Sequence, residues 1–176
     1  MKIIAIGAVT AGGKTSAINQ IVGRIPRAVA LHFDEYSFEG EVEDFGLWVK
    51  KGADYNVWNL SPLKDDIEKV IGIGKYEYLF LDYPFAYQNS LIKDYIDCAI
   101  FIDTPLDIAL ARRVLRDMQE ASADKIRYEM ELYLKHSRAA YTQMLKDIRT
   151  TSDYVVNGAQ ELETVVEHII RIVEKV

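Results

Sequence analysis

The sequence predicts an α/β fold: a three-layer α/β/α sandwich around a mostly parallel five-stranded sheet. Five apolar runs of strand length alternate along the chain with stretches of helical periodicity. The runs are almost continuously apolar, as parallel strands buried on both faces require. A strand–helix–strand order places helices on both faces of one sheet through right-handed crossovers. The 176 residues are expected to form a single domain, because this length supports one core.

Each expected element follows from its local pattern. The strands are expected at residues 2–7, 27–33, 76–83, 97–103 and 153–157. The helices are expected at residues 14–23, 61–71, 105–118 and 124–148, with one more at the C-terminus. Ser61 and Thr104 are the expected N-caps of the second and third helices, because each precedes a proline suited to a first turn. The last helix carries an apolar stripe at helical spacing: Leu162, Val165, Val166, Ile169, Ile170 and Val173.

The composition excludes several classes of protein. A net charge of -6 and a pI near 5.1 argue against a nucleic-acid partner, which requires a basic face. The single cysteine, Cys98, allows neither an intramolecular disulfide nor a cysteine metal cluster, and it fits a reducing compartment. No apolar stretch approaches the roughly 20 residues of a membrane span, and the N-terminus is unlike a signal peptide. We expect a cytoplasmic protein without nucleic-acid or membrane partners.

A glycine-rich loop follows the first strand and precedes a helix. Its sequence, AVTAGGKTS from residue 8, nearly matches the phosphate-binding pattern G-x-x-x-x-G-K-[ST], with Ala8 in place of the first glycine. Such a loop points backbone N–H groups and a helix N-terminus at phosphates, while its lysine binds the β/γ oxygens and its hydroxyl holds Mg²⁺. We therefore expect ATP and Mg²⁺ as cofactors. The expected nucleotide-binding residues are Val9, Thr10, Ala11, Gly12, Gly13, Lys14, Thr15 and Ser16.

The backbone angle of Ala8 decides what the departure from the pattern costs. A methyl group at this position costs little if φ is negative. If φ is positive, the loop is strained by about 1–2 kcal/mol.

Two aspartates end predicted strands, where ligands gather in open α/β sheets. Asp82 ends the third strand and is expected to hold Mg²⁺ together with Thr15. Asp34 ends the second strand and is expected to orient or deprotonate an attacking hydroxyl, with Glu35 as the local competitor. The structural alternative for Asp34 is a turn or helix-capping aspartate.

The segment that follows Asp34 is the least core-like part of the chain. From Phe33 to Trp58 it holds seven acids and seven aromatics but only two lysines. Aromatics with a few polar groups are typical of a small-molecule pocket, so residues 34–60 are expected to bind the phosphate acceptor. The candidate substrate-binding residues here are Asp34, Tyr36, Asp54, Trp58 and Asn59.

Three arginines lie on one side of the helix expected at 105–118. Arg112, Arg113 and Arg116 are spaced at i+3 and i+4. Beside a phosphate-binding loop they are expected to form a lid, at about 112–138, that contacts phosphates bidentately. The alternative is a solvated face paired with acids such as Asp117.

With these residues in view, the chain resembles the uridine kinase-like P-loop nucleoside kinases, a group that includes nicotinamide riboside kinases and phosphoribulokinase. FIDTPLDIALARRVLRD is similar to the family's DT…D…L.RR..RD segment, and HFDEYSF is similar to its D-[SDE]-[FY]-[YF] stretch. The resemblance implies a P-loop NTPase fold with a helical lid. It implies that Asp34 activates the acceptor and that Arg113 and Arg116 contact phosphate. It also implies that the last β–α connection, with Asn157, lies near the adenine.

The chain departs from the family pattern in the segment YNVWNL. Asn59 stands where the family stretch W-D-x-L has an acid, with Asp54 and Asn56 nearby. An amide can still form a hydrogen bond with a hydroxyl group. Asp82 stands where many members of the family have a glutamate.

We therefore expect a kinase that transfers the γ-phosphate of ATP to a hydroxyl of a small metabolite, such as uridine or a related riboside. Lys14 would hold the β/γ-phosphates, and the three arginines would close over the transferred group. Two alternatives stay open. A regulatory ATPase would hydrolyse ATP without an acceptor, and a catalytically silent nucleotide-binding module would fit the changes at Ala8 and Asn59.

Overall fold

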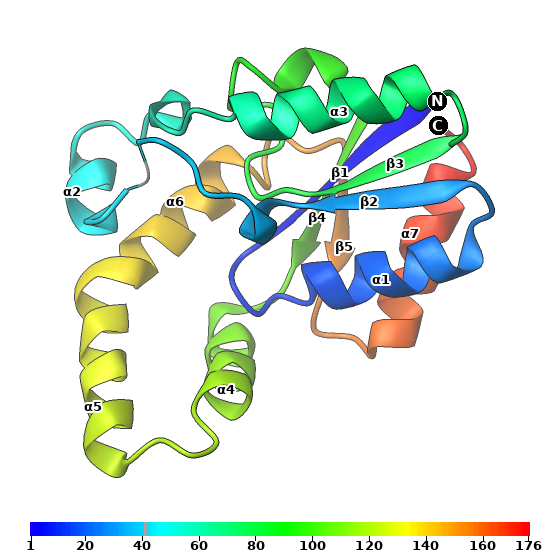
Figure 1. The fold of residues 1–176 in the computed structure, drawn as a ribbon. Helices are drawn as coiled ribbons and strands as arrows, with labels where there is room; N and C mark the ends of the chain where they lie inside the picture. Colours follow the sequence, from blue (N-terminus) through cyan, green and yellow to red (C-terminus); the bar gives the residue numbers. More distant parts are fainter. Residues whose placement is uncertain (41) are drawn as a thin grey trace.

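The computed structural model describes residues 1–40 and 42–176 and contains a five-stranded, all-parallel sheet with the strand order β2-β3-β1-β4-β5 (Figure 1). The strands are β1 (Lys2–Ala8), β2 (Ala28–His32), β3 (Tyr78–Asp82), β4 (Cys98–Asp103) and β5 (Tyr154–Asn157). The predicted fold class and all five strands are confirmed. The chain runs from β1 outward to β2 and β3 on one side, then to β4 and β5 on the other. Loops at the carboxyl ends of β1, β3 and β4 therefore border a crevice where the strand order reverses.

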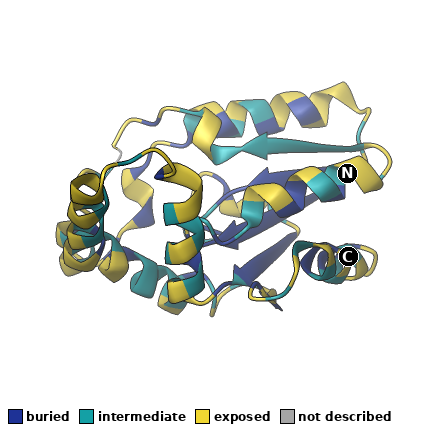
Figure 2. Cartoon of the chain, turned by 90° about the horizontal axis from the view of Figure 1, so that it is seen from below, coloured by how far each residue is buried: buried dark blue, intermediate teal, exposed yellow. Residues whose placement is uncertain are grey.

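Helices cover both faces of the sheet. One layer is α3 (Ser61–Ile73), and the other is α1 (Lys14–Arg24) with α7 (Leu162–Val173) (Figure 1). Alternate residues of β1 supply the two cores: Ile3 packs toward α3, whereas Ile4 packs toward α1 and α7. The strands β1, β3 and β4 are mostly buried, whereas the edge strand β2 is half-buried and the edge strand β5 is largely exposed (Figure 2). Within the described residues, no helix combines the length and the apolar character needed to cross a membrane.

A helical arm extends from the carboxyl edge of the sheet. It consists of α4 (Leu106–Asp117), α5 (Ala123–Leu132) and α6 (Arg138–Asp147) (Figure 1). The prediction of one uninterrupted α-helix over 124–148 is wrong in one respect, because a π-helical turn at Tyr133–Ser137 joins α5 to α6. Periodicity over the whole segment could not reveal one wider turn, which shifts the helical phase by a single residue.

Both predicted N-caps differ from the structure. Helix α3 begins at Ser61 itself, and the side-chain oxygen of Asn59 accepts hydrogen bonds from the Ser61 N–H and hydroxyl groups at 3.2 and 2.7 Å. Helix α4 follows Pro105, and the Thr104 hydroxyl donates instead to the carbonyl of Gly12 in the glycine-rich loop at 2.8 Å. The Thr104 side chain therefore ties β4 to that loop rather than capping a helix.

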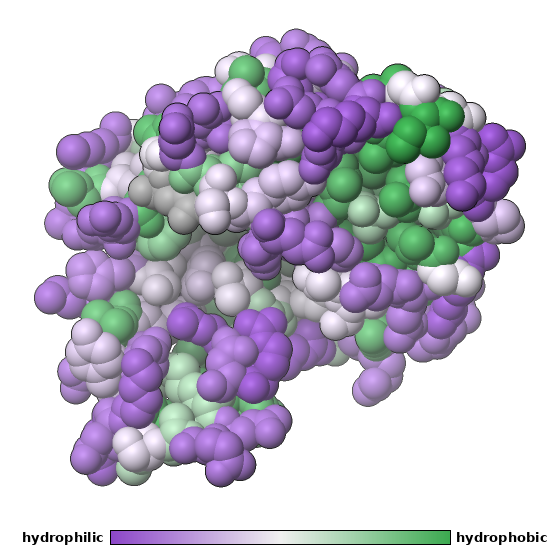
Figure 3. Space-filling view, in the orientation of Figure 1, coloured by the Kyte–Doolittle hydropathy of each residue, from purple (hydrophilic) through white to green (hydrophobic). Residues whose placement is uncertain are grey.

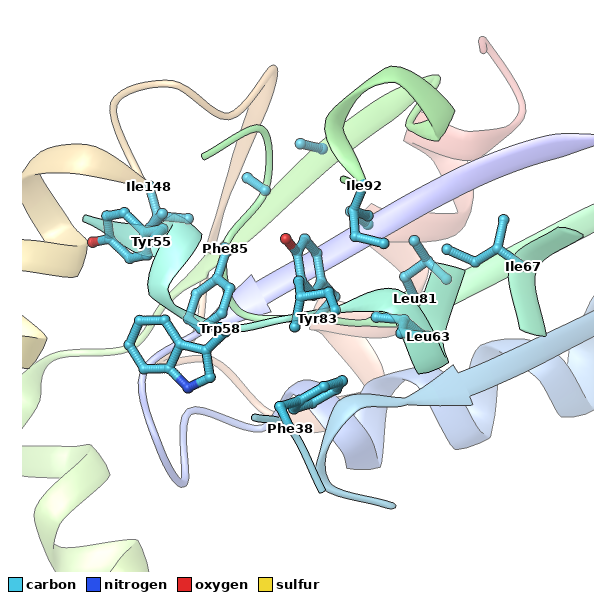
Figure 4. Close-up of a cluster of buried hydrophobic side chains, with 14 of the residues drawn as sticks. Phe38, Tyr55, Trp58, Leu63, Ile67, Leu81, Tyr83, Phe85, Ile92 and Ile148 are labelled. Carbon is cyan, nitrogen blue, oxygen red and sulfur yellow. The ribbon is translucent and has the colours of Figure 1, made fainter. Parts of the chain in front are cut away.

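The aromatic segment after β2 folds over the edge of the α3 layer. It contains a 3₁₀ helix at Phe33–Glu35, the short helix α2 (Phe45–Lys50) and a second 3₁₀ helix at Tyr55–Val57. Glu41, within the acceptor-binding region expected at 34–60, lies outside the described residues. Trp58 packs against Phe85 with ring centroids 4.8 Å apart and near Tyr55, so these aromatics belong to the core (Figure 4). Burial of these rings anchors the segment to the sheet.

Two glycines allow a matched test of how tightly the chain after β5 packs against the end of β4. A Cβ at Gly158, after β5, would stand 2.0 Å from the Thr104 hydroxyl oxygen, whereas a Cβ at Gly23 in α1 meets nothing within 4 Å. We expect Gly158→Ala to lower the free energy of unfolding by about 1–3 kcal/mol through overpacking. Gly23→Ala should raise it by about 0.5–1 kcal/mol through helix propensity. Urea denaturation of both variants measures the difference, and an equal response would contradict the packing described here.

Candidate functional site

The glycine-rich loop turns sharply between β1 and α1. Ala8 ends β1 and is not among the residues with positive φ, so its methyl group adds no backbone strain. The left-handed positions are Ala11, with φ 59°, and Gly13, with φ 96°. Gly12 must lack a side chain, because a Cβ there would lie 2.8 Å from both the Ala8 methyl carbon and the Val9 carbonyl oxygen. The loop therefore accommodates Ala8 and places its strain at Ala11.

A buried polar cluster lies directly beneath this loop. Asp82, at the end of β3, is 2% exposed and forms an ion pair with the Lys14 ammonium group. The Thr15 hydroxyl donates to Asp82 Oδ2 at 2.6 Å, and His32 Nδ1 lies 2.9 Å from the same oxygen. Burial lowers the pKa of Lys14 to about 8, and the negative charge of Asp34 partly opposes this shift. The two carboxylate oxygens of Asp82 thus connect residues from β2, β3 and the loop.

The Thr15 and Asp82 oxygens fit the requirements of Mg²⁺. Both are hard oxygen donors, and the Thr15 oxygen keeps its lone pairs available because its proton is directed to Asp82. No cluster of three or more His, Cys, Asp or Glu side chains suited to a metal occurs in the described residues. This pair accordingly suits a cation that takes most of its ligands from phosphates and water.

A first cavity of about 630 Å³ opens beside the loop, between the sheet and the helical arm (Figure 3). Its lining includes the predicted residues Asp34, Tyr36, Trp58 and Arg116 together with the whole loop from Val9 to Ser16. Asp34 is exposed and lies in the 3₁₀ helix directly after β2. Its charge acts on both Lys14 and Arg116. The cavity therefore brings a carboxylate and two cations to the phosphate-binding loop.

Several expected site residues are not brought to this cavity. Asp54 caps the short helix at Tyr55–Val57 by accepting from the Asn56 N–H at 2.9 Å, and Asn59 is engaged at the start of α3. Asn157 accepts from the Ala159 N–H at 3.0 Å. Arg113 lies 3.6 Å from Glu129 and 3.9 Å from Asp117, and it lines neither described cavity.

The structure adds residues to the site that the sequence analysis did not identify. They are His32 beneath the loop, the cavity-lining aromatics Phe33, Phe45, Trp48, Tyr55 and Phe85, Ser137 at the end of the π-helical turn, and Ala140, Tyr141 and Met144 of α6. His32 had a usable signal, since it ends a strand two residues before Asp34. The α6 residues had none, because their approach depends on how the helical arm packs.

The arginines differ in position, and this difference predicts different effects on turnover. Arg116 lines the first cavity and pairs with Asp117 at 2.6 Å, whereas Arg113 bridges α4 and α5. We expect Arg116→Ala to lower kcat by about 10²–10³-fold, as loss of a charge-stabilising donor does. Arg113→Ala should affect mainly stability. Steady-state kinetics and thermal unfolding of both variants test this, and equal losses of kcat would contradict the distinction.

Comparisons with known proteins agree with this geometry. The model of the phosphoribulokinase / uridine kinase family matches residues 76–164, just over half of the chain. A uridine kinase from Borrelia turicatae is 26% identical over 180 residues, covering 89% of this chain and 86% of the relative. Uridine-cytidine kinase B from Dictyostelium discoideum is 24% identical over 198 residues, covering 95% and 80%.

Two solved structures share the fold. A deoxyadenosine kinase from M. mycoides superposes with a TM-score of 0.54 at 12% identity, covering 99% of this chain and all of that one. A sugar kinase from Janibacter sp. HTCC2649 gives a TM-score of 0.61 at 11% identity, covering 99% and 95%. At these identities the likeness shows the fold.

Proposed function

Because the chain belongs to the phosphoribulokinase / uridine kinase family, whose members are kinases, we propose that it transfers the γ-phosphate of ATP to a hydroxyl of a small metabolite, a nucleoside such as uridine or a related riboside. The observation that carries this proposal is the position of Asp34. It is an exposed carboxylate that accepts no hydrogen bond from residues 1–40 and 42–176, and it lies in the same cavity as Lys14 and Arg116. A hydroxyl bound there lies between a base and the phosphate loop.

Each residue of the site has a distinct role in an in-line transfer of the phosphoryl group. Lys14 and the loop N–H groups bind the β/γ-phosphates, and Arg116 neutralises charge that develops on the transferred group. Asp34 orients the acceptor hydroxyl and takes up its proton. Thr15 and Asp82 would hold Mg²⁺, which supplies further charge neutralisation at the phosphate oxygens.

The lining of the first cavity favours an uncharged phosphate acceptor with a planar ring. Tyr36, Tyr55 and Trp48 line it, and their polar atoms already donate to Asp66, Asp147 and the Asp54 carbonyl. They present ring surfaces rather than free donors. Lys14 and Arg116 are the cations in the described lining, and both lie at the phosphate end, so a phosphorylated sugar has no separate anion site there. Stacking on aromatic faces suits a nucleobase.

The test is transfer of labelled γ-phosphate from ATP and Mg²⁺ to a panel of acceptors. The panel holds pyrimidine and purine nucleosides, nicotinamide riboside, pantothenate, sugars and a control without acceptor, each with wild type and Asp34→Asn. Transfer to ribosides, lost in the variant, is the expected result. Label released only as free phosphate, at the same rate in every tube, would show ATP hydrolysis without transfer and would favour an ATPase over a kinase. Transfer to an anionic acceptor alone would overturn the assigned substrate class.

A further inference from the structure

His32 contacts the functional site from outside its cavities. It ends β2, and its Cα pairs in register with that of Asp82 at the end of β3. Both side chains point to the face of the sheet that α1 covers, because Ala30 and Phe80, which precede them by two residues, pack on that face. His32 lines neither the first cavity nor a second cavity, of about 290 Å³, whose lining includes Arg112 and part of the loop. A ligand in either cavity therefore meets the residues that His32 holds and not His32 itself.

The two carboxylate oxygens of Asp82 have different partners. Oδ2 accepts from the Thr15 hydroxyl at 2.6 Å and lies 2.9 Å from His32 Nδ1. An ionised carboxylate only accepts hydrogen bonds, so Nδ1 of the imidazole carries a proton and donates it to Asp82. Oδ1 is buried and forms no hydrogen bond of ordinary geometry within residues 1–40 and 42–176, where its partner is the ammonium group of Lys14. Asp82 thus has one charged partner and two hydrogen-bond donors.

A nucleotide on the loop changes the partners of Asp82. The proposed function assigns Lys14 to the β/γ-phosphates, and an ammonium group that turns toward a phosphate gives up part of its interaction with Asp82. This aspartate is 2% exposed, so water cannot fully replace the lost partner. A buried charge that loses its counter-ion is strongly destabilised unless other donors stabilise it. Thr15 and His32 are the donors that remain.

We propose that His32 is a positioning residue that releases Lys14 for nucleotide binding. Its Nδ1–H group stabilises the buried Asp82 carboxylate while the Lys14 ammonium group turns toward the phosphates. The hydrogen bond is present with and without nucleotide, but it contributes more in the nucleotide complex, where Asp82 has fewer partners. His32 therefore increases nucleotide affinity without touching the nucleotide. This inference rests on the proposed function, because it requires that Lys14 bind phosphate.

The test is ADP binding measured by titration calorimetry in buffer with EDTA, so that no metal ion replaces Lys14 at Asp82. His32→Asn places an amide N–H group close to the position of Nδ1, whereas His32→Gln, with its longer side chain, places the amide near the position of Nε2. His32→Gln should bind ADP about 10-fold more weakly than wild type, as the loss of one hydrogen bond to a charged group predicts. His32→Asn should bind ADP within about 3-fold of wild type, because it retains the donor.

Two further variants separate this role from simple packing. In the Asp82→Asn background no buried charge needs a donor, so His32→Gln should not lower ADP affinity further. His168→Gln changes another half-buried histidine, on α7 and outside both cavities, and should bind ADP as wild type does. Thermal unfolding of the ligand-free variants is measured in parallel, since a purely structural role would lower stability and leave ADP affinity unchanged.

The outcomes distinguish this inference from the proposed function. Unchanged ADP affinity in folded His32→Gln, or equal losses in His32→Asn and His32→Gln, would overturn the role of His32 and leave the kinase proposal intact. The same holds if wild type binds ADP only when Mg²⁺ is present, because His32 would then not suffice to stabilise Asp82. Absence of ADP binding by wild type with and without Mg²⁺ would overturn both. If His32→Gln alone does not fold, a loss of ADP affinity on adding it to Asp82→Asn would equally overturn the role of His32.

Discussion

Lys14→Met is expected to lower kcat for phosphate transfer by about 10²–10³-fold or more, the cost of removing one preorganised charge from a transition state. The side chain of Lys14 is only 13% exposed, and it begins α1 where the loop N–H groups converge. Methionine retains the apolar stem but not the charge. Steady-state kinetics with saturating acceptor measures the loss.

The change at Lys14 also leaves the buried charge of Asp82 without its ion-pair partner, so stability must be separated from catalysis. Adding Asp82→Asn to Lys14→Met should restore much of the lost thermal stability but none of the turnover. Lys64→Met removes a half-exposed lysine that pairs with Glu68 on α3, far from the loop in sequence, and it should leave kcat unchanged. Normal turnover in folded Lys14→Met would rule out its role at the phosphates.

Asp34→Asn is expected to lower kcat by about 10²–10⁴-fold, because an amide cannot take up the proton of the attacking hydroxyl. Asp34 is exposed at the cavity, so the unfolding free energy should change by less than about 0.5 kcal/mol. Nucleotide affinity should not fall, since the variant removes a negative charge near the phosphates. Rapid-quench transfer assays and ADP titration measure the two quantities.

Glu35→Gln is the matched control for Asp34→Asn. Glu35 is the adjacent exposed acid in the same 3₁₀ helix, and it does not line the first cavity. Turnover should persist in Glu35→Gln. The reverse result, with transfer lost in Glu35→Gln and retained in Asp34→Asn, would identify Glu35 rather than Asp34 as the base.

The sheet could be predicted from the sequence because burial on both faces forces continuous apolar runs. The residues at which strands end and helices begin were harder to predict, because one side chain can form hydrogen bonds with several different partners. Thr104 had the chemistry of an N-cap but donates to Gly12, a contact between residues 92 positions apart in the chain. Such long-range hydrogen bonds leave no local signal.

A site residue could be predicted where the end of a strand fixes its position. It could not be predicted where tertiary packing or a local hydrogen bond fixes its position. Asp34 and the loop lie at the carboxyl edge of the sheet as their positions after β2 and β1 required. Asn59 and Asp54 have the right chemistry for a substrate hydroxyl, yet local hydrogen bonds engage them at helix starts.

The π-helical turn at Tyr133–Ser137 has a consequence for comparing this chain with its relatives. One additional residue in a helical turn rotates everything on its far side by about 100°. A relative whose arm is a plain α-helix would need a one-residue gap within this turn for its α5 faces to correspond. An ungapped alignment would assign the lid residues of such a relative to the wrong side of the helix, so differences in α5 between family members should be judged only after the turn is located in each.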